Sequence, residues 1–249
     1  MGLLWRRISE NQDVPPWGVF TALGMAVGAF ASILLGAGIV GSFRVEMPHG
    51  ILLAYCLGMG FTALLVTVAC NRTPAHGAAL AMGAATTRIP LILMLSFGVG
   101  AALDLLTLAL ANVPLIASEF GSAGGVPAIH RAGFGAWFLV ALLLLVLQPI
   151  GEGLVFRGVV YPSLRAILGE RTGFFMTAIW FGIFHMLAYA PASNSGEFGS
   201  LWVTLIAPVL AGVYLNAIRA ATRSTRVSMV AQAGLGLFLL IRAYTVIGG

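Results

Sequence analysis

The sequence predicts an all-α fold, a polytopic bundle of about seven transmembrane helices. Hydrophobic residues make up 59% of the chain and charged residues only 8%, and the mean hydropathy is +1.00. A protein with so little charge lacks the polar surface that a water-soluble domain needs. Each crossing of a ~30 Å hydrocarbon core takes roughly 17–25 apolar residues, so a chain of 249 residues has room for about seven crossings.

Seven apolar stretches are expected to form these crossings, separated by short segments rich in Pro, Gly, Asn and Ser. Their approximate bounds are 17–41, 50–70, 89–112, 134–164, 172–190, 199–219 and 226–247. The first stretch is too long for a cleaved signal peptide, so it is interpreted as an anchor. We therefore expect residues 1–249 to form a single transmembrane domain, with residues 1–16 as a cytoplasmic N-terminal segment.

The positions of the basic residues indicate the orientation. All thirteen are Arg, and nearly all flank the apolar stretches, which is typical of membrane topology and not of nucleic-acid binding. If the N-terminus is cytoplasmic, only Arg44, Arg131 and Arg242 face outward. Nine then face inward: Arg6, Arg7, Arg72, Arg88, Arg165, Arg171, Arg219, Arg223 and Arg226. The sequence thus predicts an integral protein of the bacterial cytoplasmic (inner) membrane, with its N-terminus inside and its C-terminus outside.

Small residues recur every four positions in the first apolar stretch, at Gly24, Gly28, Ser32 and Gly36. This spacing lets a second helix backbone approach closely. Packing within the chain is favoured over a dimer seam, and the oligomeric state stays open.

Two ionisable residues stand deep inside the apolar stretches. Glu152 lies thirteen residues before Arg165, and His185 lies thirteen residues after Thr172. At 1.5 Å per residue, both are about 20 Å from the cytoplasmic ends of their helices. Charged or polar groups at this depth usually face a cavity or a partner, so we expect them to meet within about 8 Å on adjacent helices.

Each of these residues also has an ordinary structural interpretation. Glu152 can be a carboxylate that pairs with Arg157, and His185 can make a simple interhelical hydrogen bond. In an α-helix, a spacing of five residues places Glu152 and Arg157 roughly 140° apart around the axis, which disfavours direct pairing. The aromatic residues Phe174, Phe175, Trp180, Phe181 and Phe184 can line a substrate groove, but packing is the favoured interpretation.

The residues around Glu152 and His185 resemble the CAAX-protease and bacteriocin-processing (CPBP) family of intramembrane proteases. The first family motif, E-E-x-x-x-R, is similar to the segment that contains Glu152, Gly153 and Arg157, and F-x-x-x-H matches Phe181 and His185. The resemblance covers about residues 90–240.

Three family residues are replaced in this chain. Gly153 stands in place of the second glutamate, Gln232 in place of the second histidine, and Gly236 in place of the asparagine of the third motif. The resemblance implies Glu152 as the base that activates water, His185 as a metal ligand or electrostatic partner, and Arg157 as a supporting group. Gln232 has an amide that can donate to an oxyanion.

The zinc expected from the resemblance is short of ligands here. Catalytic zinc usually takes three protein ligands, and His185 is the one clear imidazole donor. The amides of Gln232 and Asn216 offer weak oxygens. Zinc is therefore expected to bind weakly or not at all.

Three functions remain open at this stage. The first is a CPBP-type endopeptidase that hydrolyses a peptide bond of a membrane-embedded or membrane-adjacent substrate. The second is a catalytically degenerate member that binds a membrane partner as a chaperone, immunity factor or assembly subunit. A small-solute transporter is third, and the lack of an inverted repeat disfavours it. The expected partners are membrane lipid and a membrane peptide or protein, without nucleic acid.

Overall fold

The computed structural model describes residues 3–10, 14–83, 89–112, 115, 123, 125–189 and 197–246. These residues are almost entirely helical, and no strand occurs among them. The prediction of an all-α bundle is therefore confirmed.

The helices before the site run in the order α1 (Leu3–Ile8), α2 (Val19–Ser42), α3 (His49–Cys70), α4 (Pro74–Ala79), α5 (Ile89–Ala111) and α7 (Gly125–Ala132). One long helix then combines α8 (Phe134–Leu142), η2 (Leu143–Leu147), α9 (Gln148–Glu152), η3 (Gly153–Val160) and α10 (Tyr161–Leu168), where η marks π-helix. The remaining elements are α11 (Glu170–Ala188), α12 (Glu197–Leu201), η4 (Trp202–Ile206), α13 (Ala207–Thr222) and α14 (Thr225–Val246).

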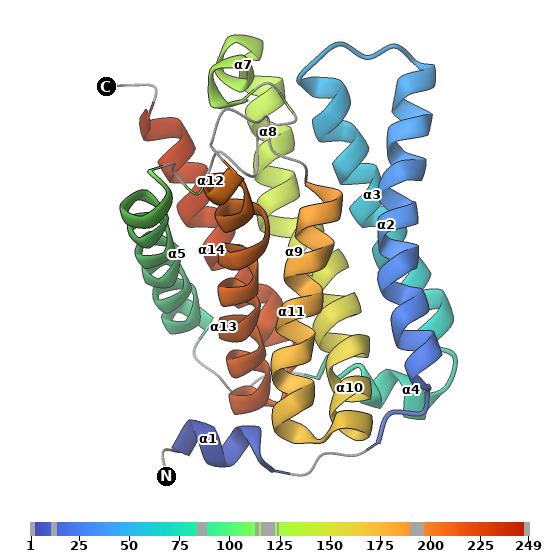
Figure 1. Cartoon of the computed structure of the whole chain (residues 1–249). Helices are drawn as coiled ribbons and strands as arrows, with labels where there is room; N and C mark the ends of the chain where they lie inside the picture. The colour runs from blue at the N-terminus through green and yellow to red at the C-terminus, as the bar shows by residue number, and fades with distance from the viewer. Residues whose placement is uncertain are drawn as a thin grey trace.

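The described residues form seven long helical passes. Figure 1 shows how these passes lie alongside one another in a bundle. Six of these passes are long and apolar enough to cross a membrane by length and composition. The seventh, α11, has 19 residues and carries Glu170, Arg171 and His185, and it is not among those six. The helices α1 and α4 lie at one end of the bundle, and α7 and α12 lie at the other (Figure 1).

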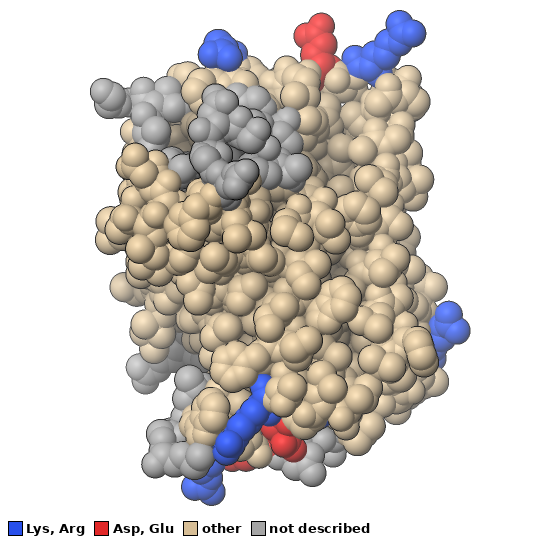
Figure 2. All heavy atoms as spheres, viewed as in Figure 1, with Lys and Arg blue, Asp and Glu red and all other residues tan. Residues whose placement is uncertain are grey.

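The outer surface suits a membrane. On the visible face, charged side chains gather toward the two ends and a broad uncharged zone lies between them (Figure 2). Large apolar side chains such as Leu34, Met94 and Leu105 are more than half exposed. In a soluble protein such a surface would promote aggregation, whereas lipid chains cover it in a bilayer. The chain is an integral membrane protein.

The α2 and α3 helices pack through their small residues. A Cβ added to Gly36 would lie 2.5 Å from the carbonyl oxygen of Ala54, and one added to Gly58 would lie 2.6 Å from the Cα of Ile33. A Cβ added to Gly28 would lie 2.5 Å from Cδ2 of Leu65, a side-chain atom, whereas one added to Gly24 would meet nothing within 4 Å. The favoured interpretation, packing within the chain, is therefore confirmed for most of this pattern.

The long helix that carries Glu152 differs from the prediction in two ways. It ends at Leu168, four residues beyond the expected position, because Gly169 with its positive φ of 81° is the first residue to leave the helix. It also contains two π-helical segments, η2 and η3, and every residue of η3 is buried. In π-helix, hydrogen bonds join residues five apart. Glu152 and Arg157 therefore lie nearer to one face than the expected 140°, which assumed an α-helix.

The short helix α1 is held against the bundle end by polar contacts. Arg165 donates to the carbonyl oxygen of Glu10 at 2.7 Å, and the Glu10 carboxylate accepts from Arg223 at 2.5 Å and from Arg7 at 3.1 Å. The hydrogen bond from Arg223 is the main reason that the pKa of Glu10 lies below its usual range. This anchor therefore persists as the pH falls through the ordinary Glu range and is lost only at lower pH.

Candidate functional site

Glu152 is the centre of a buried hydrogen-bond network. Its side chain is 1% exposed at the end of α9, inside the bundle. Three hydrogen bonds fix the carboxylate in place. Oε1 accepts from Tyr189 Oη at 2.8 Å and from Gln148 Nε2 at 3.2 Å, and Oε2 accepts from Gln232 Nε2 at 2.6 Å. Both oxygens act as acceptors, which is the arrangement that stabilises an ionised carboxylate away from water.

His185 faces this carboxylate from α11. Its Nε2 lies 3.9 Å from Glu152 Oε1, so the expectation that the two groups meet within about 8 Å is confirmed. The other ring nitrogen, Nδ1, lies 3.1 Å from the carbonyl oxygen of Phe181. A carbonyl can only accept, so Nδ1 carries the hydrogen and a neutral imidazole keeps its lone pair on Nε2, facing Glu152.

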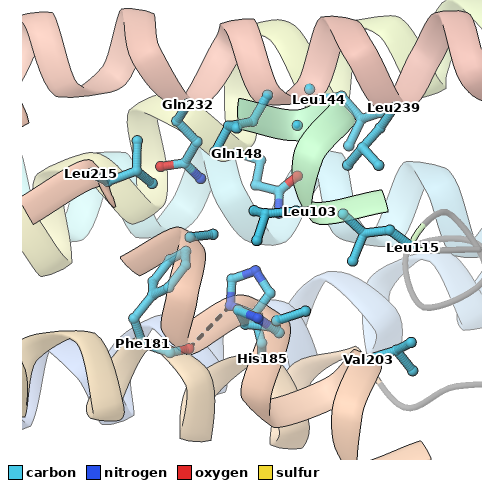
Figure 3. A pocket seen from close by; sticks show the side chains of 16 residues that line it. Leu103, Leu115, Leu144, Gln148, Phe181, His185, Val203, Leu215, Gln232 and Leu239 are labelled. Atoms are coloured by element: carbon cyan, nitrogen blue, oxygen red, sulfur yellow. Dashed lines mark hydrogen bonds between the residues drawn. The ribbon is translucent and has the colours of Figure 1, made fainter. Parts of the chain in front are cut away.

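A cavity of about 70 Å³ adjoins the pair. Three polar side chains, His185, Gln148 and Gln232, lie around it, and most of the remaining lining is aliphatic (Figure 3). About 10–15 Å³ holds one water molecule, so the space takes several waters or one small side chain. Glu152 is not among the lining residues, but Gln148 and Gln232 line the cavity and donate to its carboxylate, so they connect the two.

The predicted aromatic cluster is mainly packing. Phe174, Phe181 and Phe184 are buried, and Phe175 is 45% exposed. Phe156 packs edge-on against Phe181 and Phe184, with ring centroids 5.2 Å apart in both pairs. Among the residues described around the cavity, Phe181 is the one member of the cluster that lines it.

Arg157 is completely buried but makes no ion pair with Glu152 among the described residues. Its guanidinium lies over the ring of Phe181, 4.1 Å from the centroid, and none of its three nitrogens has a hydrogen-bond partner in the described part. The cation–π contact partly offsets the cost of burying this charge. Arg157 therefore contacts the ring of Phe181, which packs on His185, and does not contact the carboxylate.

Two amides named from the sequence have different positions. Gln232 lies in the site, and its Oε1 is buried without a hydrogen-bond partner in the described residues, so it can accept from a ligand. Asn216 instead donates to the carbonyl oxygen of Phe174 at 2.9 Å. Phe174 is eleven residues, or about 16 Å along the helix, from His185. Asn216 is therefore distant from His185, and of the two amides only Gln232 lies in this site.

Two further site residues, Gln148 and Tyr189, were missed by the sequence interpretation. Gln148 lies four residues before Glu152, the spacing at which helical side chains meet, and this signal was present in the sequence. Tyr189 follows α11 directly, and its ring also packs on His185 with centroids 5.0 Å apart. Nothing in the local sequence pattern distinguishes it from an ordinary interfacial Tyr.

The positions that differ from the family motifs are tightly packed. A Cβ at Gly153 would lie 2.5 Å from Met229 Cγ, a flexible side-chain atom. At Gly236 it would lie 2.4 Å from the backbone carbonyl oxygen of Leu144. Adding the missing Glu or Asn therefore requires neighbouring groups to move, and at Gly236 the neighbour is the backbone of the long helix itself.

The donor set does not fit a catalytic zinc ion. Such a site takes three ligands from His, Glu, Asp or Cys, and no group of three such residues occurs among the residues described. His185 offers one nitrogen, and the Glu152 oxygens already accept three hydrogen bonds. The chemistry of the site is therefore derived below from the side chains alone.

Comparison with protein families matches residues 134–238 to the family described as type II CAAX prenyl endopeptidase Rce1-like. This confirms the resemblance to the CAAX-protease family over a region that runs from α8 into α14 and includes Glu152, His185 and Gln232. Comparison with curated proteins and with solved structures gives no match.

Proposed function

We propose that the chain is an intramembrane endopeptidase, because residues 134–238 match the type II CAAX prenyl endopeptidase Rce1-like family. Its substrate would be a peptide segment that lies in or beside the membrane. The observation that supports this most directly is the buried Glu152–His185 pair, 3.9 Å apart beside a cavity with polar groups. A carboxylate and an imidazole at this depth are expensive to bury and are typical of function.

The geometry suggests how a water would be activated. A gap of 3.9 Å is too long for a direct hydrogen bond but is spanned by a water about 2.8 Å from each group. Such a water donates one hydrogen to Glu152 Oε1 and the other to His185 Nε2, which leaves a lone pair for attack on a carbonyl carbon. Glu152 takes the proton as the C–O bond forms and returns it to the amine nitrogen as the C–N bond breaks.

The developing oxyanion would be stabilised by the side-chain amides. Gln148 and Gln232 each use one N–H on Glu152, and each Nε2 carries a second hydrogen. Both residues line the cavity in which the reacting carbonyl would sit. A fixed N–H donor of this kind is worth about 10²–10³ in rate. The free Oε1 of Gln232 can accept an N–H of the substrate backbone.

The cavity also restricts the substrate. At about 70 Å³ it holds a peptide group or a small side chain, not a whole transmembrane helix. The scissile segment is therefore expected to be extended and apolar next to the cleaved bond. Purified protein incubated with a library of membrane peptides, followed by mass spectrometry of the products, tests this function. Cleavage between small apolar residues supports it, and an intact library at long incubation contradicts it.

A second function, binding of a membrane partner without cleavage, is favoured by a different observation. Gly236, the residue in place of the family's Asn, is packed against the backbone of Leu144, so part of the family site is filled by the chain itself. In this case the protein acts as a chaperone, immunity factor or assembly subunit. Affinity purification that recovers one membrane protein in stoichiometric amount, with no cleavage product, would establish it.

Metal content gives an independent prediction. With one imidazole and one occupied carboxylate, we expect the purified protein to carry well under one equivalent of zinc. Any proteolysis should then persist in the presence of a chelator. Elemental analysis measures the zinc directly. One tightly bound zinc per chain that is lost in His185→Ala would show that a further ligand exists and would contradict this prediction.

We further propose that the chain lies in the bacterial cytoplasmic membrane with its N-terminus inside. The proposal rests on the nine arginines expected on the inner side, of which Arg88 is outside the described residues. Reporter fusions after residues 45, 120 and 195 are expected to read external. Residue 45 lies beyond α2, whereas residues 120 and 195 lie outside the described part. Two cytoplasmic readings among the three would overturn this orientation.

A further inference from the structure

A second cavity is lined by residues of the segment before α2, of α4, of α10 and of the end of α13. Figure 1 shows α4 and α1 at the same end of the bundle. The cavity has a volume of about 510 Å³. Its described lining consists of apolar groups, among them Pro15, Pro16, Ala79 and Pro162, and two arginines, Arg219 and Arg223. No residue of this lining takes part in the site described above. The cavity combines uncharged walls with two cations.

Arg219 is the feature that points to a ligand. It is 4% exposed, although it carries a positive charge. Its Nε donates to Thr225 Oγ1 at 3.1 Å and to the carbonyl oxygen of Arg157 at 3.4 Å. In the part of the chain that the structure describes, neither of its terminal nitrogens makes a hydrogen bond, and no carboxylate pairs with it. These terminal donors are available to a ligand in the cavity, and an anion there would offset the cost of a charge that is largely removed from water.

The second cation, Arg223, completes an electropositive site. It follows α13 in a left-handed conformation with a φ of 54°, and its Nη2 donates to the Glu10 carboxylate. Glu10 is shared with Arg7, so one carboxylate offsets two exposed cations. In the described part of the chain Arg219 has no carboxylate partner, and its guanidinium lies 5.8 Å from the ring centroid of Tyr161. Among the described lining residues there is no Asp or Glu. The described lining of the cavity therefore carries a net positive charge.

We propose that this cavity binds the phosphate group of an anionic phospholipid. Guanidinium groups match phosphate oxygens through paired N–H donors, and Arg219 has two donor groups available. The alanine and proline walls offer apolar contacts to the glycerol and the first methylenes of a lipid, which a free phosphate ion lacks. The cavity also lies where α13, part of one of the six candidate membrane spans, ends. Basic pockets between transmembrane helices near the membrane surface are suited to lipid headgroups.

The test uses the whole protein in nanodiscs that contain phosphatidylcholine with a minor fraction of phosphatidylglycerol. Native mass spectrometry counts the phosphatidylglycerol that stays bound. We expect retention by the unchanged protein and a loss of about fivefold in Arg219→Gln. The matched control is Arg72→Gln, which removes an exposed arginine near α4 that does not line the cavity and should not change retention.

Further arms distinguish the possible occupants. Ala79→Phe fills the cavity without touching the charge of Arg219, so it should also release the lipid and decides the question if Arg219→Gln does not fold. Glu152→Gln should retain the lipid, because this site is independent of the proposed proteolysis. Equal losses in Arg72→Gln and Arg219→Gln would show general surface attraction and overturn the proposal. Displacement by millimolar inorganic phosphate would assign the cavity to a free anion and overturn the lipid assignment.

Discussion

The variant Glu152→Gln is expected to lose at least about 100-fold of the rate of peptide-bond cleavage. The amide is nearly the same size as the carboxylate but cannot take a proton from water. It also replaces one acceptor oxygen by a donor, which faces Tyr189, Gln148 or Gln232 and disrupts a hydrogen bond. The measurement is the single-turnover rate on a peptide found in the library assay, compared with the unchanged protein.

A matched variant separates the loss of the base from damage to the network. Tyr189→Phe removes one hydrogen bond to Glu152 Oε1 and keeps the carboxylate. One hydrogen bond to a charged group is worth about 1.5–3 kcal/mol, and part of that value is expected in the rate, about tenfold. Equal cleavage rates in Glu152→Gln and the unchanged protein would show that Glu152 is not the base and would contradict the proposed mechanism.

Much of the fold was predictable because the bilayer constrains the chain so strongly. Every buried backbone group must be satisfied within a helix, so runs of apolar residues translate directly into helical passes. The depth estimate for Glu152 and His185 was equally direct, since a helix converts residue number into distance at 1.5 Å per residue. For this reason the sequence could predict that Glu152 and His185, 33 positions apart, lie close together, and the structure places His185 Nε2 3.9 Å from Glu152 Oε1.

Other features depend on contacts that a single sequence does not encode. The π-helical segment Gly153–Val160 is fully buried, and it turns Arg157 toward Phe181 in a way that α-helical geometry did not predict. Tyr189 reaches Glu152 because α11 ends at Ala188, and this end position sets where its ring lies. Gln232 Oε1 has no hydrogen-bond partner among the described residues because of the way α14 packs, which the sequence of α14 alone does not predict.

Restoring the asparagine of the family's third motif by Gly236→Asn is expected to destabilise the protein by about 1–3 kcal/mol or more. The new Cβ would lie 2.4 Å from the carbonyl oxygen of Leu144 and 3.1 Å from its carbonyl carbon. These are backbone atoms of the long helix that carries Glu152, so relief requires a shift of α14 away from η2. Thermal unfolding in detergent measures the loss, and cleavage activity should fall in parallel.

Two glycine variants serve as controls for Gly236→Asn. In Gly153→Ala the Cβ meets Met229 Cγ, an atom of a flexible side chain, so the loss should be smaller. In Gly98→Ala the Cβ meets nothing within 4 Å, and the better helix propensity of Ala should leave stability unchanged or raise it by up to about 1 kcal/mol.

If Gly236→Asn is instead as stable as the unchanged protein, then α14 can move relative to Leu144. In that case the missing asparagine does not reflect packing, and Gln232→His combined with Gly236→Asn becomes the variant in which zinc binding should be measured.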